Sequence, residues 1–305
     1  MGEFLETYRG EALAWEADDL GHLNMRFYFA RSGQARTVLL ASLGLTNAFK
    51  AHAFSTAIIS EQHIHYLAEL LPGRGIIVET GVINIDKTDM TIVHMIKAAP
   101  NTLSAVITEK ITHISTRTHK PFSWPSRVRE MVKSFTIEPP KQALPRNIDL
   151  KEKPGIPTLK AARELGLQAI GRGAFLPGEC DVFGFVRPYD IIGRVSDSVQ
   201  HITTGWPDIA FTGNHSISGA ILEGRIMHRK RPEAGDCYVI YSGLRQANTH
   251  VRELCHWILD PVSGNCWASM IGVACKFDLK ARRLIKNDKK VLALLEKNKI
   301  KGLVP

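Results

Sequence analysis

The feature that most constrains this sequence is that it repeats itself. At an offset of 163 residues the two halves align over 23 positions without a gap. The seven identities are Arg9, Gly10, Leu13, Glu16, Asp18, Gly21 and Arg31 with Arg172, Gly173, Leu176, Glu179, Asp181, Gly184 and Arg194. At an offset of 162 further identities follow in the same order, including Glu61 with Glu223 and His94 with His256. Such ordered self-similarity indicates a duplicated domain.

A proline-rich segment separates the two copies. Residues 136–160 contain Pro139, Pro140, Pro145, Pro154 and Pro157, a density that excludes a continuous helix or a central strand. We therefore predict a domain at 1–135, a linker at 136–160 and a second domain at 161–305. A chain of 305 residues is long enough for two domains of ordinary size.

The composition is that of a folded globular chain, with 44% hydrophobic and 23% charged residues. No apolar stretch reaches the roughly 20 residues of a membrane span, and the first residues do not resemble a secretory signal. The five cysteines are too few and too irregularly spaced for a disulfide framework. These features predict a cytoplasmic protein with reduced thiols.

The pattern of apolar residues predicts the same element order in both copies. In copy one it predicts a strand at 7–16, a long buried helix at 20–45 capped by Asp18 and Asp19, and four strands at 58–67, 75–86, 90–98 and 104–115. In copy two it predicts a helix at 188–205 and strands at 217–229, 237–244, 251–259 and 266–276. Short turns between consecutive strands favour an antiparallel sheet, so each copy is an α+β domain.

A short motif stands at the entry of the first predicted helix. It consists of Asp18, Gly21, His22, Asn24 and Tyr28. This pattern resembles the D-x-x-G-H-x-N-x-x-x-Y signature of acyl-CoA thioesterases related to 4-hydroxybenzoyl-CoA thioesterase. Residues 64–73, which include Tyr66, are similar to the second-strand pattern of that family. The resemblance covers 7–115 well and 170–278 more weakly.

The resemblance implies a double hotdog fold, in which each domain is an antiparallel sheet wrapped around a long central helix. It also implies hydrolysis of an acyl-CoA to a free acid and CoA, with no cofactor beyond the CoA of the substrate. Single hotdog domains pair through their sheets, so the chain is expected to be its own pseudo-dimer. Association of two such chains remains open.

The chemistry of thioester cleavage fits the residues of the motif. The reaction needs a carboxylate that attacks the carbonyl or activates water, and donors for the oxyanion that forms. Asp18 is the candidate carboxylate, and amides of the Gly21–Asn24 turn are candidate donors at a helix N-terminus. The resemblance gives His22 and Asn24 orienting roles. The alternative for Asp18 is simple helix capping.

Other residues are candidates with weaker support. Tyr28, Tyr66 and Glu61 are candidate substrate contacts, although Glu residues at a strand start, such as Glu61 and its counterpart Glu223, are more often solvated. His63 and His65 share one face of a strand, and without a third ligand at a suitable spacing they predict surface histidines and no metal site. His94 and His256 lie among apolar residues and are predicted to be structural.

Copy two departs from the motif. Asp181 and Gly184 remain, but Phe185, Arg187 and Ile191 stand where copy one has His22, Asn24 and Tyr28. The second site is therefore predicted to be degraded.

The net charge of +9 is concentrated near the C-terminus, where residues 276–305 hold ten Lys or Arg against three acids. Residues 281–300 predict an amphipathic helix that packs on the second domain, with a lysine face that is solvated or attracts the phosphates of CoA. No nucleic-acid motif with interleaved aromatic residues accompanies this charge.

Two other functions are compatible with a hotdog fold. One is a non-catalytic acyl-CoA binding or regulatory module, because one copy has already lost its motif. The other is a hydratase or dehydratase, whose signature places His five residues after Asp. In this sequence Asp18 and His22 are four apart, which counts against that group.

Overall fold

The computed structural model describes residues 2–209 and 217–305. The chain forms two compact units. Unit 1 contains Met1–Leu144 and Cys180–Asp190, and unit 2 contains Pro145–Glu179 and Ile191–Pro305. Within the described ranges no helix is long and apolar enough to cross a membrane. The five cysteines are free thiols, as predicted.

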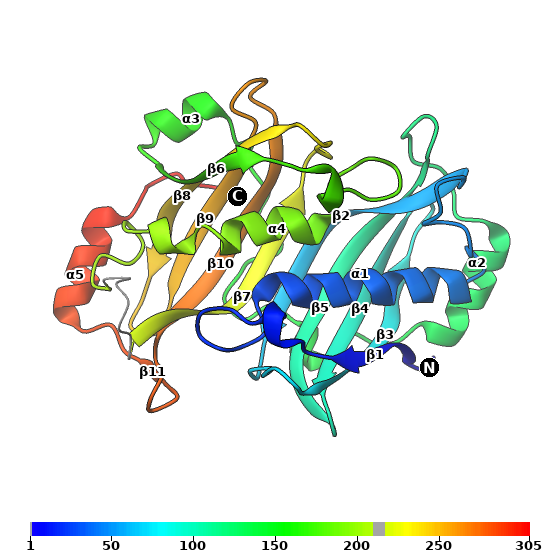
Figure 1. Cartoon of the computed structure of the whole chain (residues 1–305), viewed down its shortest axis with the longest axis horizontal. Helices are drawn as coiled ribbons and strands as arrows, with labels where there is room; N and C mark the ends of the chain where they lie inside the picture. Colours follow the sequence, from blue (N-terminus) through cyan, green and yellow to red (C-terminus); the bar gives the residue numbers. More distant parts are fainter. Residues whose placement is uncertain (1, 210–216) are drawn as a thin grey trace. The chain divides into compact units, whose positions relative to one another are not determined.

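Unit 1 is an antiparallel sheet with one long helix against it. The strands run in the order β1-β3-β4-β5-β2, and α1 packs against β1, β3, β4 and β5 (Figure 1). The strands are β1 (Leu5–Glu11), β2 (Ser55–Tyr66), β3 (Gly75–Ile85), β4 (Asp89–Ala98) and β5 (Thr102–Ser115). The helices are η1 (Ala14–Glu16), α1 (Met25–Ser42), α2 (Ser126–Met131), η2 (Val132–Phe135) and η3 (Lys141–Ala143).

Unit 2 repeats this plan. Its strands run in the order β7-β10-β9-β8-β6, and β11 pairs with β10. The strands are β6 (Gln168–Ala174), β7 (Ile217–His228), β8 (Cys237–Ala247), β9 (Arg252–Leu259), β10 (Cys266–Asp278) and β11 (Arg283–Ile285). The helices are α3 (Leu159–Glu164), η4 (Pro177–Glu179), α4 (Pro188–Ser196), η5 (Val199–His201) and α5 (Lys289–Asn298), although the start of α4, up to Asp190, is assigned to unit 1.

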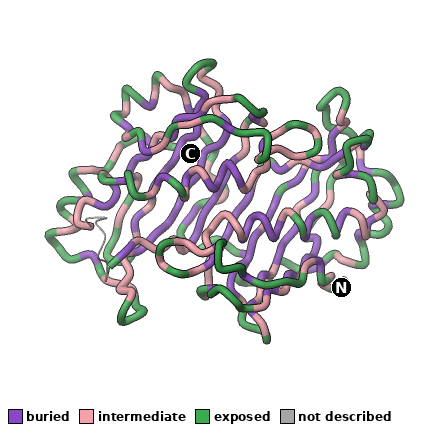
Figure 2. Tube along the Cα trace, viewed as in Figure 1, coloured by how far each residue is buried: buried purple, intermediate pink, exposed green. Residues whose placement is uncertain are grey.

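The eight predicted strands that follow the two helices are confirmed to within a few residues, and the sheets are antiparallel as predicted. The signals behind this success are the enrichment of the segments in β-branched residues and the turn residues between them. Both faces are covered, so the strands of each unit are largely buried (Figure 2). In unit 1 the face opposite α1 packs through Val93 and Val106 on Ile137 and Ala143.

The predicted helix boundaries were less accurate. The first helix begins at Met25 and not at residue 20, because residues 18–23 form a turn and the Asn24 side chain accepts the Arg26 N–H as N-cap. Asp18 and Asp19 therefore do not cap it. The predicted strand at 7–16 ends at Glu11, before η1.

Two predicted helices of copy two are also shorter than expected. The helix α4 ends at Ser196 and not near residue 205. The predicted helix at 281–300 is divided, since Arg283–Ile285 pairs with β10 and only Lys289–Asn298 is helical. The helix α5 does pack on unit 2, as predicted. Its Leu295 side chain is buried, and the N–H of Ile300, just after the helix, donates to the Leu244 carbonyl.

Several identities of the repeat have a common structural reason. In unit 1 the buried Glu16 carboxylate accepts the Leu13 N–H at 3.1 Å and pairs with Arg31 of α1. In unit 2 Glu179 accepts the Leu176 N–H and pairs with Arg194 of α4. Each ion pair ties the loop before the helix to the helix itself.

Candidate active site

The motif forms a tight turn directly before α1. The Asp18 N–H donates to the His22 carbonyl at 2.8 Å, and the Gly21 N–H donates back to the Asp18 carbonyl at 3.1 Å. Gly21 has a φ of +78°, a left-handed conformation that glycine adopts without strain. The motif needs a glycine here because of this conformation.

The Asp18 carboxylate organises the turn through one of its oxygens. Oδ1 accepts the N–H groups of Leu20 at 3.0 Å and His22 at 3.2 Å. The side chain is 25% exposed. Burial raises the pKa of Asp18, and the hydrogen bond and charge of His22 only partly oppose this effect. A raised pKa suits a carboxylate that must exchange a proton near neutral pH.

His22 lies between two carboxylates. Its Nδ1 is 3.8 Å from Asp18 Oδ1, and its Nε2 is 3.4 Å from Oε1 of Glu69. Sequence reasoning missed Glu69, which lies in the turn after β2. The available signal was its position inside the second motif segment, three residues after Tyr66. The structure therefore brings an imidazole and two acids together at the N-terminus of α1.

The turn that carries Glu69 is fixed by its neighbours. The Leu23 N–H donates to the Leu70 carbonyl at 2.7 Å, which joins this turn to the Asp18 turn. Ser104 Oγ donates to the Ala68 carbonyl at 2.7 Å and lies 3.3 Å from the Tyr28 hydroxyl. Tyr28 thus anchors the Glu69 turn to α1.

The charge of Asp18 also acts on the Tyr28 hydroxyl. Burial raises the pKa of Tyr28 to about 12, the hydrogen bond with Ser104 opposes this, and the charge of Asp18 adds to it. The phenol is therefore neutral at physiological pH and can act as a hydrogen-bond donor.

The amides expected to form the oxyanion hole are already engaged. Gly21 donates to Asp18 O, His22 to Asp18 Oδ1, Leu23 to Leu70 O and Asn24 to Glu16 O. Asn24 serves α1 as its N-cap. The next amide along the chain is that of Met25, the first residue of α1, and such N–H groups have no intrahelical acceptor.

Of the other two predicted substrate contacts, Tyr66 lies beside the motif and Glu61 does not. Tyr66 packs edge-on against Tyr28, with ring centroids 5.2 Å apart, and so adjoins the motif. Glu61 pairs with Lys110 of β5 at 3.2 Å. It precedes Tyr66 by five residues on β2, a separation of roughly 16 Å at about 3.3 Å per residue. The structure does not bring Glu61 to the Asp18 turn.

The second copy of the motif keeps the hydrogen-bonded turn but has no imidazole at the position of His22. Asp181 Oδ1 accepts the N–H groups of Phe183 at 2.8 Å and Phe185 at 3.1 Å, as Asp18 does in copy one. Phe185 contributes a ring that packs edge-on against His119. The hydrogen bonds to the backbone of the turn therefore account for an aspartate in both copies. At the position of His22, copy two has Phe185 and so lacks the imidazole.

Three other predictions for polar residues need correction or support. His63 and His65 are buried and not on the surface, and His65 Nδ1 lies 2.8 Å from the Gln142 carbonyl. Glu223 is buried and not solvated, because its carboxylate accepts the N–H groups of Arg146 and Asn147. The prediction that His94 is structural is supported by its hydrogen bond of 2.8 Å with Thr80.

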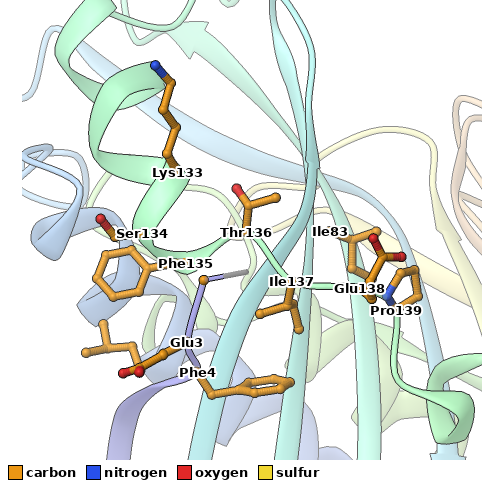
Figure 3. Close-up of a pocket in the computed structure, with 12 residues that line it drawn as sticks. Glu3, Phe4, Ile83, Lys133, Ser134, Phe135, Thr136, Ile137, Glu138 and Pro139 are labelled. Atoms are coloured by element: carbon orange, nitrogen blue, oxygen red, sulfur yellow. The ribbon is translucent and has the colours of Figure 1, made fainter.

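Unit 1 also has an open groove beside the start of β1 (Figure 3). Its walls come from residues 2–5, Ile83 and residues 133–139, and its volume is about 870 Å³. None of these lining residues belongs to the Asp18 turn. The groove is therefore separate from the candidate active site.

Comparison with known protein families gives a match over residues 12–132, to the thioesterase-like superfamily. This range contains both the Asp18 turn and Glu69. The match supports thioester hydrolysis as the general reaction and agrees with the resemblance seen in the motif. A comparison with curated proteins found no significant match.

Solved structures with the same fold include thioesterases. An acyl-ACP thioesterase from Bacteroides thetaiotaomicron is 14% identical with a TM-score of 0.66, covering 88% of this chain and 96% of its own. A 12:0-ACP thioesterase from Umbellularia californica is 11% identical with a TM-score of 0.65, covering 88% and 93%. At these identities the likeness shows the fold, which is the double hotdog that the resemblance implied.

Proposed function

We propose that this chain hydrolyses an acyl-CoA thioester to the free acid and CoA, and that Asp18 acts on the thioester. The observation that carries the proposal is the contact of His22 with both Asp18 and Glu69 at the N-terminus of α1. A thioester needs an activated oxygen, an oxyanion donor and a proton for the leaving sulfur. Asp18 offers the oxygen, His22 the proton, and the Met25 N–H at the start of α1 the oxyanion donor.

The free oxygen of Asp18 begins the reaction. Oδ1 holds two backbone amides, so Oδ2 either attacks the thioester carbon or removes a proton from the water that attacks it. The oxyanion is stabilised by the N-terminal dipole of α1 and by the Met25 N–H. Cleavage of the C–S bond leaves the electron pair on sulfur, and His22 supplies the proton. Glu69 orients His22 from the other side.

Isotope labelling distinguishes the two routes. Direct attack forms a mixed anhydride between Asp18 and the acyl group, which water then hydrolyses. In a single turnover in ¹⁸O-labelled water, ¹⁸O in the Asp18 carboxylate therefore identifies direct attack, because activation of water places all of the label in the released acid.

CoA is proposed as the carrier because of the charge of the chain. The ten basic residues of 276–305 lie at the end of unit 2, from β10 to beyond α5, and can attract the phosphates of CoA. The acyl-ACP thioesterases of the same fold make an acyl carrier protein the alternative carrier. Release of free thiol from an acyl-CoA panel tests the proposal. A chain that binds acyl-CoA but releases no thiol would be a binding module.

Replacement of Glu69 by Gln tests the assignment of the second acid. The change keeps the shape but removes the charge beside His22, so kcat should fall at least about tenfold while KM changes little. The melting temperature should not change, since the carboxylate is 36% exposed. Glu130→Gln is the matched control, because Glu130 is exposed and pairs with Lys133 on the surface. Equal kcat values for the two variants would contradict a role for Glu69.

A further inference from the structure

The layer between α1 and the sheet of unit 1 contains a buried polar network. At its centre is Glu109 of β5, which is fully buried. Its Oε1 accepts hydrogen bonds from Ser32 Oγ at 2.7 Å and Gln62 Nε2 at 2.8 Å, and its Oε2 pairs with Arg36 at 2.7 Å. Two of these partners come from α1 and one from β2. The network therefore spans the layer from helix to sheet.

The network continues across the sheet toward β1. His94 Nε2 lies 3.5 Å from Glu109 Oε2, and His94 Nδ1 lies 2.8 Å from the Thr80 hydroxyl. The Thr80 hydroxyl in turn lies 2.7 Å from that of Thr7. An alkyl chain pushed into this layer would have to separate charged and polar groups from their partners, at a large cost. The network closes this layer to a long acyl chain.

Tyr66 stands at the end of the same layer that adjoins the active site. Gln62 and Tyr66 are four residues apart on β2 and point to the same face, the one that α1 covers. The Tyr66 ring packs against Tyr28, which is in the first turn of α1 and close to Asp18. An acyl group that enters from Asp18 therefore meets Tyr66 before it meets Glu109.

The Tyr66 hydroxyl has an unused hydrogen-bonding capacity. Its oxygen is buried, and the part of the chain described by the structure supplies no hydrogen-bond partner for it. Buried phenols are almost always hydrogen-bonded, and an unsatisfied one is a candidate for contact with a ligand. The neighbouring Tyr28 hydroxyl is already within reach of Ser104. Tyr66 thus has an O–H available to donate.

We propose that the acyl group of the substrate is short and carries a hydroxyl or keto oxygen that accepts a hydrogen bond from Tyr66. This inference rests on the proposed function and specifies its substrate class. Tyr66 recognises the oxygen, and the Glu109 network limits the length of the chain beyond it. The substrate class differs from the 12:0 group in the name of the Umbellularia californica thioesterase, which shares only the fold.

Matched substrates test both parts of the inference. Initial rates are compared for 3-hydroxybutyryl-CoA, butyryl-CoA and lauroyl-CoA. We expect kcat/KM to be at least about tenfold higher for the hydroxylated substrate than for butyryl-CoA, and lowest for lauroyl-CoA. A preference for lauroyl-CoA, or equal rates for the two four-carbon substrates, would overturn the inference.

The variant Tyr66→Phe removes only the hydroxyl and should leave the fold intact, because among the described residues that hydroxyl has no hydrogen bond to lose. The preference for 3-hydroxybutyryl-CoA should disappear, so that kcat/KM of this variant for the hydroxylated substrate falls to its own value for butyryl-CoA. Tyr241→Phe, in unit 2, is the matched control and should keep the preference. A Tyr66→Phe enzyme with an unchanged preference would show that the phenol does not form a hydrogen bond with the acyl group.

Binding separates this inference from the proposed function. Calorimetry on the full chain with Asp18→Asn measures the affinity for the same two four-carbon CoA esters without turnover. Tighter binding of the hydroxylated ester that depends on Tyr66 supports the inference even if no thiol is ever released. Equal affinities would overturn it even if the enzyme hydrolyses both esters.

Discussion

Asp18→Asn is expected to lower thioesterase turnover by at least about a hundredfold, the low end for loss of an acid–base group. The amide oxygen of Asn can still accept the N–H groups of Leu20 and His22, so the turn before α1 should persist. The charge needed for attack or for activation of water is lost. The readout is kcat from thiol release, with the melting temperature as the measure of folding. A stable Asp18→Asn protein with full activity would mean that Asp18 only shapes the turn.

Asp181→Asn is the internal control for that experiment. Asp181 makes the same two hydrogen bonds to its own turn, but Phe185 stands in place of the imidazole. The substitution should change turnover by much less than Asp18→Asn. Equal losses from the two changes would mean that the second copy is active.

Much of the fold and part of the site could be predicted from the sequence. The repeat predicted two domains with the same element order. The identities that it preserves include residues that hold the loop before the helix in place, such as Glu16 and Arg31. Enrichment in β-branched residues, with turn residues between the segments, predicted the strands. The motif located Asp18 and His22, because a short turn brings residues four apart together by local geometry.

What escaped prediction depends on contacts between distant segments. Glu69 lies 47 positions after His22 and reaches it only because the turn after β2 pairs with the Asp18 turn through Leu23 and Leu70. The start of α1 also escaped, because Asp18, Asp19 and Asn24 are all good caps and sequence does not decide among them. The amides of residues 21–24 were likewise predicted to be oxyanion donors, whereas they donate to backbone carbonyls and to the Asp18 carboxylate.

The two copies show that the polar network is not required by the fold itself. By strand register Gly272 in unit 2 takes the place of Glu109, since it lies opposite Leu254 and Gly224 as Glu109 lies opposite Ile92 and Gln62. Unit 2 thus lacks the carboxylate. Burial there lowers the pKa of His256 to about 4, whereas its counterpart His94 lies beside Glu109. The network is therefore a property of copy one, the copy with the intact motif.

Replacing Glu109 is expected to have the largest effect on stability. Glu109→Gln leaves the Arg36 guanidinium buried without its counter-charge, and breaking a buried ion pair in this way costs about 3–5 kcal/mol. Urea denaturation at pH 7 measures the loss of unfolding free energy. Lys97→Gln, which breaks the more exposed pair with Glu79, should cost at most about 1 kcal/mol. Similar losses in the two variants would contradict a buried pair at Glu109.

The same loss should depend on pH in a defined direction. Burial alone would raise the pKa of Glu109, but the charges of Arg36 and His94 outweigh it and hold that pKa below the usual value of 4.5. A carboxylate whose pKa is lowered by folding stabilises the native state above its unfolded pKa, and this contribution is lost as the pH falls below it. The difference in unfolding free energy between wild type and Glu109→Gln should therefore be greatest at neutral pH and shrink steadily below about pH 4.5. A difference that stays constant down to pH 3 would mean that the network acts through its shape and hydrogen bonds and not through the charge of Glu109.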